Sequence, residues 1–242
     1  MLMARTRARL PYPLPTLTEE LRLTRDGYGP VAGVDEVGRG AWAGPLVAAA
    51  VVLPPVFSPA LADALTAQLM GVRDSKTCSP EERATLAERI RGTAQGIGIG
   101  VVSSLEIDRF GLTVANQLAM RRAVDALPWT PGYVLLDWVR LPGLPIPQRA
   151  FPRGDATSLS IAAASIVAKV TRDGLLGALD ARYPGYDFAR HKGYGTAVHR
   201  AALRTHGPSP EHRYRFAPVH AAAVARRSRP LLTADGTALA AG

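Results

Sequence analysis

Three acidic side chains stand where two apolar stretches of the sequence end. Asp35 and Glu36 follow the apolar run that starts at residue 31, and Asp137 follows the run 134–136. Such runs predict buried strands, and ligands of α/β sheets bind at the carboxyl ends of the strands. Adjacent carboxylates resist joint ionisation unless a cation neutralises them, and ligation by carboxylate oxygens alone favours Mg²⁺ or Mn²⁺. The pattern therefore predicts a divalent-metal site, of the kind that typically hydrolyses phosphodiesters with two ions.

The geometry of the first two acids depends on the glycines that follow them. Because side chains alternate along a strand, Asp35 and Glu36 should point to opposite faces of the sheet. Both reach one cluster only if the strand bends or ends there, which Gly38 and Gly40 allow. A plain turn is the alternative interpretation of Gly38-Arg39-Gly40.

A fourth acid, Asp173, lies in a long alanine-rich segment that predicts a helix. Counting back by four residues gives Lys169 and Ser165, so the three form one polar stripe. From the spacing alone, a solvated helix face with an ordinary Lys169–Asp173 ion pair is the commoner interpretation. The histidines lie late in the chain without the spacing of a zinc helix, and we interpret His191 and His199 as phosphate-side or structural residues.

The elements that position these acids alternate between strands and helices. Strands are predicted at 31–36, 46–53, 97–103 and 133–136, the first two joined by a tight turn, and helices at 79–91, 106–127, 158–182, 197–205 and 221–227. Segment 54–70 is ambiguous, and the proline-rich segment 138–152 predicts a loop. This order favours an α/β domain whose mixed central sheet is flanked by helices.

Composition and charge narrow the class of protein. The 242 residues are 47% hydrophobic, which suits one domain with a real core. The net charge is +9, and from Arg182 onward ten Arg and Lys residues stand against three acids, a difference of +7. A basic flank suits a polyphosphate partner, because each neutralised phosphate releases counterions. From the charge alone, a general bias of the amino-acid composition toward arginine remains an alternative explanation of this basic flank.

Cysteine usage and hydropathy exclude several classes of protein. The single cysteine, Cys78, excludes a disulfide within the chain and a cysteine-based zinc site. No apolar run reaches the roughly 18–20 residues of a membrane span. The arginines near the N-terminus are followed by prolines in place of the apolar core of a secretory signal. We therefore expect a cytoplasmic protein with no membrane partner.

Five segments, in their order along the chain, resemble the motifs of the type 2 ribonucleases H, in particular those of single-chain bacterial ribonuclease HII. They are GVDEVGRGAWAGPLVAAAVVL at 33–53, Asp74-Ser75-Lys76, Arg153-Gly154-Asp155, IAAASIVAKVTRD at 161–173 and His191-Lys192-Gly193-Tyr194-Gly195. Any one of them could arise by chance, but five in order are highly specific. The resemblance covers roughly residues 31–218.

The resemblance implies a ribonuclease H-like fold with a C-terminal helical extension, in a chain of four parts. These are a flexible N-terminal arm at 1–30, the catalytic domain at 31–182, a basic substrate-binding extension at 183–227 and a disordered tail at 228–242. It also implies that Asp35, Glu36, Asp137 and Asp173 are catalytic and hold two Mn²⁺ or Mg²⁺ ions.

The resemblance further implies the substrate and the residues that bind it. Gly38-Arg39-Gly40 would recognise the ribose 2′-hydroxyl and Tyr194 the sugar at the RNA-to-DNA junction, with further substrate contacts from Lys76, Ser165 and Lys169. The enzyme would cut the RNA strand of RNA–DNA hybrids on the 5′ side of a ribonucleotide, including a single ribonucleotide embedded in duplex DNA, and leave 3′-hydroxyl and 5′-phosphate ends. We expect a monomer, and the sequence gives no basis for a contact with a replication clamp.

The chain departs from the family pattern at two positions, and two other functions stay open. Trp138 stands where the family usually has glycine after the third acid, and Arg153 replaces a usual lysine. One alternative is a related two-metal nuclease or a ribonuclease HIII-type enzyme with a broader hybrid preference. The other is a catalytically silent nucleic-acid-binding module, against which the presence of all four acids argues.

Overall fold

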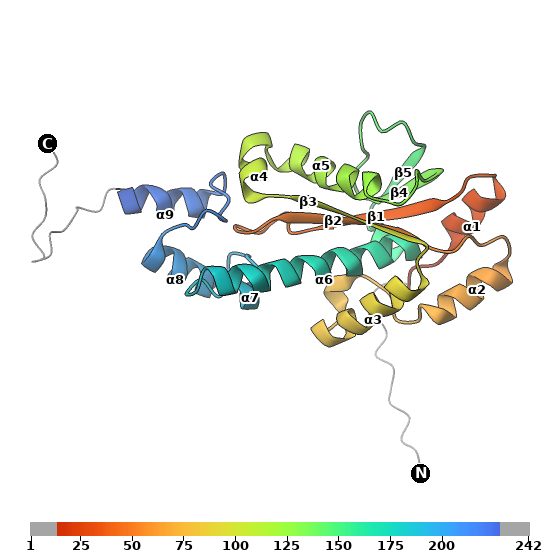
Figure 1. Cartoon of the computed structure of the whole chain (residues 1–242), viewed down its shortest axis with the longest axis horizontal. Helices are drawn as coiled ribbons and strands as arrows, with labels where there is room; N and C mark the ends of the chain where they lie inside the picture. Colours follow the sequence, from red (N-terminus) through yellow and green to blue (C-terminus); the bar gives the residue numbers. More distant parts are fainter. Residues whose placement is uncertain (1–13, 228–242) are drawn as a thin grey trace, which may run out of the picture. The chain divides into compact units, whose positions relative to one another are not determined.

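The computed structural model describes residues 14–227 (Figure 1). Its strands are β1 (Val31–Val37), β2 (Leu46–Val52), β3 (Gly96–Val102), β4 (Tyr133–Asp137) and β5 (Gln148–Phe151). Its helices are α1 (Thr18–Arg25), α2 (Pro59–Gln68), α3 (Pro80–Thr93), α4 (Ser104–Phe110), α5 (Leu112–Asp125), α6 (Leu159–Arg182), α7 (Phe188–His191), α8 (Ala197–His206) and α9 (Ala217–Arg227), with 3₁₀ turns at Ser75–Thr77 and Gly154–Ala156. Within these residues, no helix combines the length and hydrophobicity that a membrane span requires. The expected tail 228–242 and residues 1–13 of the expected arm lie outside the described residues.

The chain forms two compact units. The sheet unit comprises the residues up to Val37 together with Val47–Gly100 and Gln117–Val170, and the second unit comprises Gly38–Leu46, Val101–Asn116 and the residues from Thr171 on. This division differs from the expected domains 31–182 and 183–227. The loop after β1 and the segment around α4 group with the C-terminal residues, although they come early in the chain.

The sheet is mixed, as the sequence predicts, with the strand order β3-β2-β1-β4-β5. β1 pairs antiparallel with β2 and parallel with β4, and β4 pairs parallel with β5. Two predictions are wrong here: residues 38–45 form a loop in place of a tight turn, and the predicted loop 138–152 contains β5. Only Phe151 of this short edge strand is buried, so no hydrophobic run marks it in the sequence.

The third strand shows why the sheet tolerates a run of alternating glycines. Ile97 and Ile99 of β3 pack against the main core cluster. Gly98, between them, faces α5, where an added Cβ would lie 2.0 Å from the carbonyl oxygen of Ala123. Because side chains alternate along a strand, β3 has one face of isoleucines and one of glycines, and the glycine face lets a helix approach closely.

The opposite face of the sheet is covered by α3 and the first part of α6 (Figure 1). The main core cluster joins Ala49 and Val51 of β2 to Ala163 and Val167 of α6 and to Ile90 of α3. Alanines on both sides of this contact keep the helix close to the strands. The long alanine-rich helix that carries the polar stripe is thus anchored to the sheet by its apolar face.

The predicted helix 106–127 is in fact two helices. α4 ends at Phe110 and α5 begins at Leu112, because Gly111 between them has a φ of +81°, outside the helical region. Ser103 and Glu106 form a capping box that starts α4 earlier than predicted. The hydrophobic period continues across the glycine, which is why the sequence indicates a single helix.

Part of the segment expected to be a flexible arm is helix α1. Its Leu23 belongs to a buried cluster with Ile161. The buried carboxylate of Glu20 accepts hydrogen bonds from the Ser158 hydroxyl (2.6 Å), the Ser160 hydroxyl (2.7 Å) and the Ser160 backbone N–H (3.1 Å). Burial raises the pKa of Glu20, although these hydrogen bonds lower it. Because the N–H groups at a helix start favour an acceptor of this kind, α1 helps to set where α6 begins.

Replacing Gly33 with alanine should destabilise the sheet unit. A Cβ at Gly33 would lie 2.2 Å from the carbonyl carbon of Ser160, in the backbone of α6. We expect the free energy of unfolding to fall by about 3 kcal/mol, as for an overpacked core, which urea unfolding would measure. Gly92→Ala in α3 is the control, because nothing lies within 4 Å of its added Cβ. That variant should be neutral or gain about 0.5 kcal/mol, and equal losses in both variants would contradict the packing argument.

Candidate metal centre

The pairing of β1 with β4 brings Asp35 beside Asp137. The two strands are parallel neighbours with Val34 paired to Leu136, so the next residue of each strand is an acid. Residues in register on neighbouring strands point to the same face of a sheet, about 4.8 Å apart. One carboxylate oxygen from each of Asp35, Glu36 and Asp137 lies within 4.8 Å of the others. The two strand ends therefore bring together three of the four predicted acids.

Glu36 reaches this cluster although its side chain alternates with that of Asp35 along β1. The Asp35 carboxylate turns along the chain and accepts a 2.7 Å hydrogen bond from the backbone N–H of Glu36. β1 ends one residue later, at Val37, and Gly38 takes a φ of +98°, in the left-handed region that favours glycine. Both acids lie within β1, whose pairing with β2 continues to Val37, and the hydrogen bond from the Glu36 amide to the Asp35 carboxylate is one contact that joins them.

Burial and like charges make the cluster costly unless a cation is bound. Asp35 is only 3% exposed. Its pKa is raised well above the usual value, first by removal from water and then by the charges of Glu36 and Asp137, while a hydrogen bond from Ser165 lowers it. A divalent cation offsets both costs, and carboxylate oxygens are the donors that Mg²⁺ and Mn²⁺ prefer. The residues present therefore fit such an ion.

A motif after β5 holds the third acid in place. The backbone N–H of Gly154 donates a 2.6 Å hydrogen bond to Oδ1 of Asp137. A Cβ at Gly154 would meet Cδ1 of Ile161 at 2.7 Å and Oδ1 of Asp137 at 3.3 Å, so a side chain here would push this amide away. The segment Arg153-Gly154-Asp155 therefore orients Asp137.

Asp155 is the acid near this cluster that sequence reasoning missed. It is 6% exposed, and its pKa is raised to about 6, mainly by burial and then by the charges of Asp74 and Asp137. The ammonium group of Lys76 lies 4.0 Å from Oδ2 of Asp155 and 3.7 Å from Oδ1 of Asp74. Asp155 lies in the 3₁₀ turn Gly154–Ala156, which follows β5 after an interval, so a search for acids directly at strand ends does not find it.

Two residues expected to bind substrate differ in their exposure. The Lys76 side chain is 78% exposed. Ser165 is 3% exposed, and its Oγ lies 2.9 Å from Oγ of Ser75. Because Ser165 also hydrogen-bonds Asp35, this placement favours a supporting role for Ser165 over the expected substrate contact.

Trp138 keeps a backbone conformation that glycine would adopt easily. Its φ is +60°, in the left-handed region, which is uncommon for a bulky residue. Its backbone N–H donates a 2.8 Å hydrogen bond to the carbonyl oxygen of Phe151, which ties it to β5. Trp138 is 64% exposed, so the departure from the family pattern alters the surface next to Asp137 more than the path of the chain.

In the second unit, two of the expected sugar-binding residues lie side by side. A Cβ at Gly40 would meet Cε1 of Tyr194 at 4.0 Å, and both residues are exposed. The backbone N–H of Trp42 donates a 2.8 Å hydrogen bond to the carbonyl oxygen of Gly193. The loop after β1 and the HKGYG motif at 191–195 therefore form one continuous surface.

Three buried histidines of the second unit, one of which is the first residue of the HKGYG motif, hold this motif in place. His191, His199 and His212 are at most 8% exposed. Nδ1 of His199 lies 3.0 Å from the carbonyl oxygen of Tyr194, and its Nε2 lies 2.9 Å from Nε2 of His212. Removal from water lowers the pKa of His199 to about 4 and that of His212 to about 3. The structural interpretation of His191 and His199 is therefore favoured over the phosphate-side one.

A mixed α/β sheet with acids clustered at the ends of its central strands defines an α/β protein with a divalent-cation site. Comparison with known proteins is more specific. The Ribonuclease HII family model matches residues 32–219. A protein of Herpetosiphon aurantiacus named Ribonuclease HII is 54% identical over 203 residues, which are 84% of this chain and 96% of that protein.

Solved structures show the same fold. The ribonuclease H2 from Pyrococcus horikoshii OT3 matches with a TM-score of 0.66 at 23% identity, covering 82% of this chain and 99% of that one. Bst-RNase HIII in complex with Mn²⁺ matches with a TM-score of 0.63 at 21% identity, covering 94% of this chain and 77% of that one. At these identities the likeness concerns the fold alone, and it confirms the predicted ribonuclease H-like fold.

The chain belongs to the ribonuclease HII family. Membership makes it a metal-dependent endonuclease of the ribonuclease H type, which acts on RNA–DNA hybrids. The cluster of Asp35, Glu36 and Asp137 is the group of described residues that could hold the metal.

Mn²⁺ should stabilise the folded chain through this cluster. An ion that binds only the folded state raises stability by mass action, by about 2.7 kcal/mol at a hundredfold excess over its dissociation constant. Thermal unfolding with Mn²⁺ and with EDTA would measure the rise. Asp137→Asn should lose most of it, whereas Asp125→Asn, which removes an exposed acid of α5, should keep it. A full rise in the Asp137→Asn variant would exclude Asp137 from the site.

The neutral histidine pair should make the protein less stable in acid. The pKa of His212 is about 3 in the folded chain and near 6.5 without burial, so the unfolded chain binds a proton that the folded chain does not. Its contribution to stability is complete above pH 6.5 and declines as the pH falls toward 3. The free energy of unfolding of the wild type, minus that of His212→Gln, should therefore decrease from pH 7 to pH 4. A difference that stays constant over this range would contradict the burial argument, since the carboxylates titrate alike in both proteins.

Proposed function

We propose that the chain cuts on the 5′ side of a ribonucleotide, both in RNA–DNA hybrids and at a single ribonucleotide embedded in duplex DNA, and leaves 3′-hydroxyl and 5′-phosphate ends. The cluster of Asp35, Glu36 and Asp137 within 4.8 Å is the observation that carries the hydrolytic part of this proposal. The neighbouring positions of Gly40 and Tyr194 on an exposed surface support the recognition of a sugar.

The acids would hold two divalent cations, with Asp173 as the fourth ligand residue. Bound ions of this kind supply an activated water and stabilise the leaving oxygen. The chain's own part is to fix the acids: the register of β1 and β4 places Asp35 beside Asp137, and the Gly154 amide orients Asp137. The Mn²⁺ complex of Bst-RNase HIII, a protein of the same fold, supports the choice of ion. Asp173 lies in α6, in the second unit, and its inclusion rests on the family resemblance.

The sugar would be recognised by the loop after β1 together with Tyr194. The 2′-hydroxyl is the group that distinguishes RNA from DNA at a given site. In Gly38-Arg39-Gly40 the glycines carry no side chain, so backbone groups of this loop can approach the hydroxyl closely. The exposed Tyr194 ring offers a flat face for a sugar or base.

Basic residues would supply the phosphate contacts. Lys76 projects from the turn Ser75–Thr77, and Lys169 is half-buried in α6. Together with the basic residues from Arg182 on, these side chains would position a duplex without reading its sequence. Ser165, buried beside Asp35, would act through that acid, and the protein would work as a monomer.

A DNA duplex that carries one ribonucleotide tests this function. With Mn²⁺ or Mg²⁺ we expect a single cut on the 5′ side of the ribonucleotide, and no cut with EDTA or in an all-DNA duplex of the same sequence. Gel mobility before and after phosphatase treatment identifies the product ends. An intact single-ribonucleotide duplex beside a cut RNA–DNA hybrid would contradict the proposal while leaving the family activity in place.

Asp173→Asn should abolish cleavage of both substrates. Loss of a metal ligand should cost more than roughly a hundredfold in rate, since even the outer partners of metal ligands cost up to about that much. Duplex binding should persist, because the phosphate contacts remain. Asp180→Asn, on the same helix, is the matched control and should cut normally. A rate for Asp173→Asn close to that of this control would exclude Asp173 from the metal set.

A further inference from the structure

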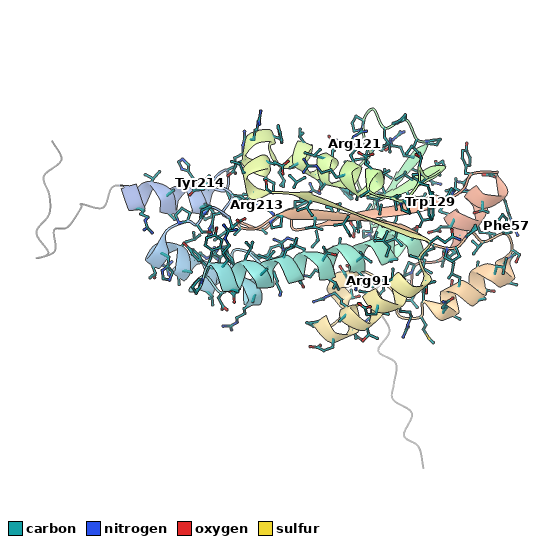
Figure 2. All side chains as sticks on the ribbon, in the orientation of Figure 1. Phe57, Arg91, Arg121, Trp129, Arg213 and Tyr214 are labelled. Carbon is teal, nitrogen blue, oxygen red and sulfur yellow. The ribbon has the colours of Figure 1, made fainter. Side chains whose placement is uncertain are left out.

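Two arginines of the second unit are buried without an acid as hydrogen-bond partner. Arg172 lies in α6, and Arg213, which Figure 2 labels, lies in the segment between α8 and α9. Both side chains are 0% exposed. Burying a guanidinium is costly, and such groups are usually paired with a carboxylate. Among the described residues, all of their hydrogen bonds go to backbone carbonyl oxygens instead.

Arg172 connects the loop after β1 with the HKGYG motif. Its Nε donates to the carbonyl oxygen of Pro45 (2.8 Å), its Nη2 to that of Ala43 (3.2 Å) and its Nη1 to that of Lys192 (2.9 Å). Its guanidinium carbon also lies 5.5 Å from the centre of the Tyr194 ring. One side chain therefore ties together the two segments that would read the sugar.

Arg213 holds the same loop at other points. Its Nε donates to the carbonyl oxygen of Gly44 (3.0 Å), and its Nη1 donates to those of Gly38 (2.7 Å) and Arg39 (3.1 Å). The carbonyl groups of residues 38, 39, 43, 44 and 45 are thus all bound by the two arginines. A loop without regular structure obtains a defined conformation in this way, and Gly40 remains exposed beside Tyr194.

Two glycines make room for this arrangement. A Cβ at Gly38 would lie 2.2 Å from Nε of Arg172, and a Cβ at Gly193 would lie 2.3 Å from the carbonyl oxygen of Ala43. Both glycines have positive φ, +98° and +79°. The motif glycines are therefore needed for the buried arginine network as well as for any approach of a substrate.

The network is costly, which argues that its geometry matters. Removal from water, followed by repulsion from Arg172, lowers the pKa of Arg213 to about 9. Nη2 of Arg213 is buried with no hydrogen-bond partner among the described residues. Apolar side chains of similar volume would avoid these costs, but only a planar guanidinium offers several donors in a fixed arrangement.

We propose that Arg172 and Arg213 are positioning residues for ribonucleotide selection. They hold the loop after β1 and Tyr194 as one rigid surface, so that the 2′-hydroxyl meets groups that are already in place. The inference rests on the proposed function. According to this inference, the two arginines affect the discrimination between ribose and deoxyribose. They affect neither the hydrolytic step nor the general binding of a duplex.

The test compares the affinities of the protein for two duplexes that differ by one 2′-hydroxyl. Asp137→Asn serves as the parent, so that neither duplex is cut. We expect the parent to bind the single-ribonucleotide duplex more tightly than the all-DNA duplex. Adding Arg213→Gln should reduce this ratio of affinities by roughly tenfold to a hundredfold, as small displacements of positioned groups do. Affinity for the all-DNA duplex should change less than about twofold, since the surface phosphate contacts remain.

Three further variants separate positioning from other effects. Tyr194→Ala should reduce the ratio of the two affinities, as Arg213→Gln does. Arg89→Gln in the sheet unit also removes one charge and one hydrogen bond to a carbonyl oxygen, that of Met70, and should keep the ratio. Arg213→Lys retains the charge but not the planar guanidinium group, and it should reduce the ratio of affinities as Arg213→Gln does. If Arg213→Lys kept the parent's ratio of affinities, the inference would be overturned, because a positive charge alone would then be enough for the preference.

The outcomes distinguish this inference from the function on which it rests. Equal affinities in the parent would contradict the proposed sugar recognition and the inference together. A parent preference that Arg213→Gln retains while folded, as shown by circular dichroism, would overturn the inference alone. If neither Arg213 variant folds, the rigidity of the loop after β1 can be measured in the wild type by hydrogen exchange. The amides of Trp42 and Gly44 report on this loop, because both donate hydrogen bonds from it to other segments of the second unit. Protection as strong as that of the β1 amides would support the inference, because the loop is then rigid. Exchange at the rate of an unstructured peptide would overturn the inference.

Discussion

Three like-charged carboxylates held within 4.8 Å of one another are the constraint on which the rest of the sheet unit depends. Without a cation the arrangement is unfavourable, so other interactions must maintain it. The parallel pairing of β1 with β4 places Asp35 beside Asp137, the Glu36 amide donates a hydrogen bond to the Asp35 carboxylate, and the Gly154 amide orients Asp137. Unfavourable arrangements of this kind are typical of functional sites. Because the folded chain has already assembled the ligands, cation binding needs little further ordering.

Buried polar side chains with backbone partners recur in both units. Glu20 accepts a hydrogen bond from the backbone N–H of Ser160 at the start of α6. In the second unit, Arg172 and Arg213 donate to loop carbonyl oxygens, and His199 lies within hydrogen-bond distance of the Tyr194 carbonyl oxygen. Each such contact fixes a helix start or a loop that hydrophobic packing alone would leave free to move. This is how the protein gives a defined conformation to segments that lie outside its regular elements.

A strand can be predicted from the sequence only when it is buried enough to form a hydrophobic run. β1 and β4 are hydrophobic runs, so the sequence predicts where each strand ends and therefore also the acids Asp35, Glu36 and Asp137. β5 is an edge strand with one buried residue, so the sequence predicts a loop there and does not indicate Asp155 in the turn that follows. The break at Gly111 was missed for the opposite reason, because the hydrophobic period continues across it.

The fold class, the strands of the sheet interior, the clustered acids and the family can all be predicted from the amino-acid sequence, because they follow from local hydrophobic periodicity and from motifs in a specific order. Contacts between groups that are distant in the chain cannot be predicted in this way. Arg213 and Gly38 are 175 residues apart in the chain, yet the arginine donates to that glycine's carbonyl oxygen. The pattern of one segment does not contain the position of its partner. Such contacts arise only when the whole chain packs, because each backbone group then takes whichever donor or acceptor the fold brings near.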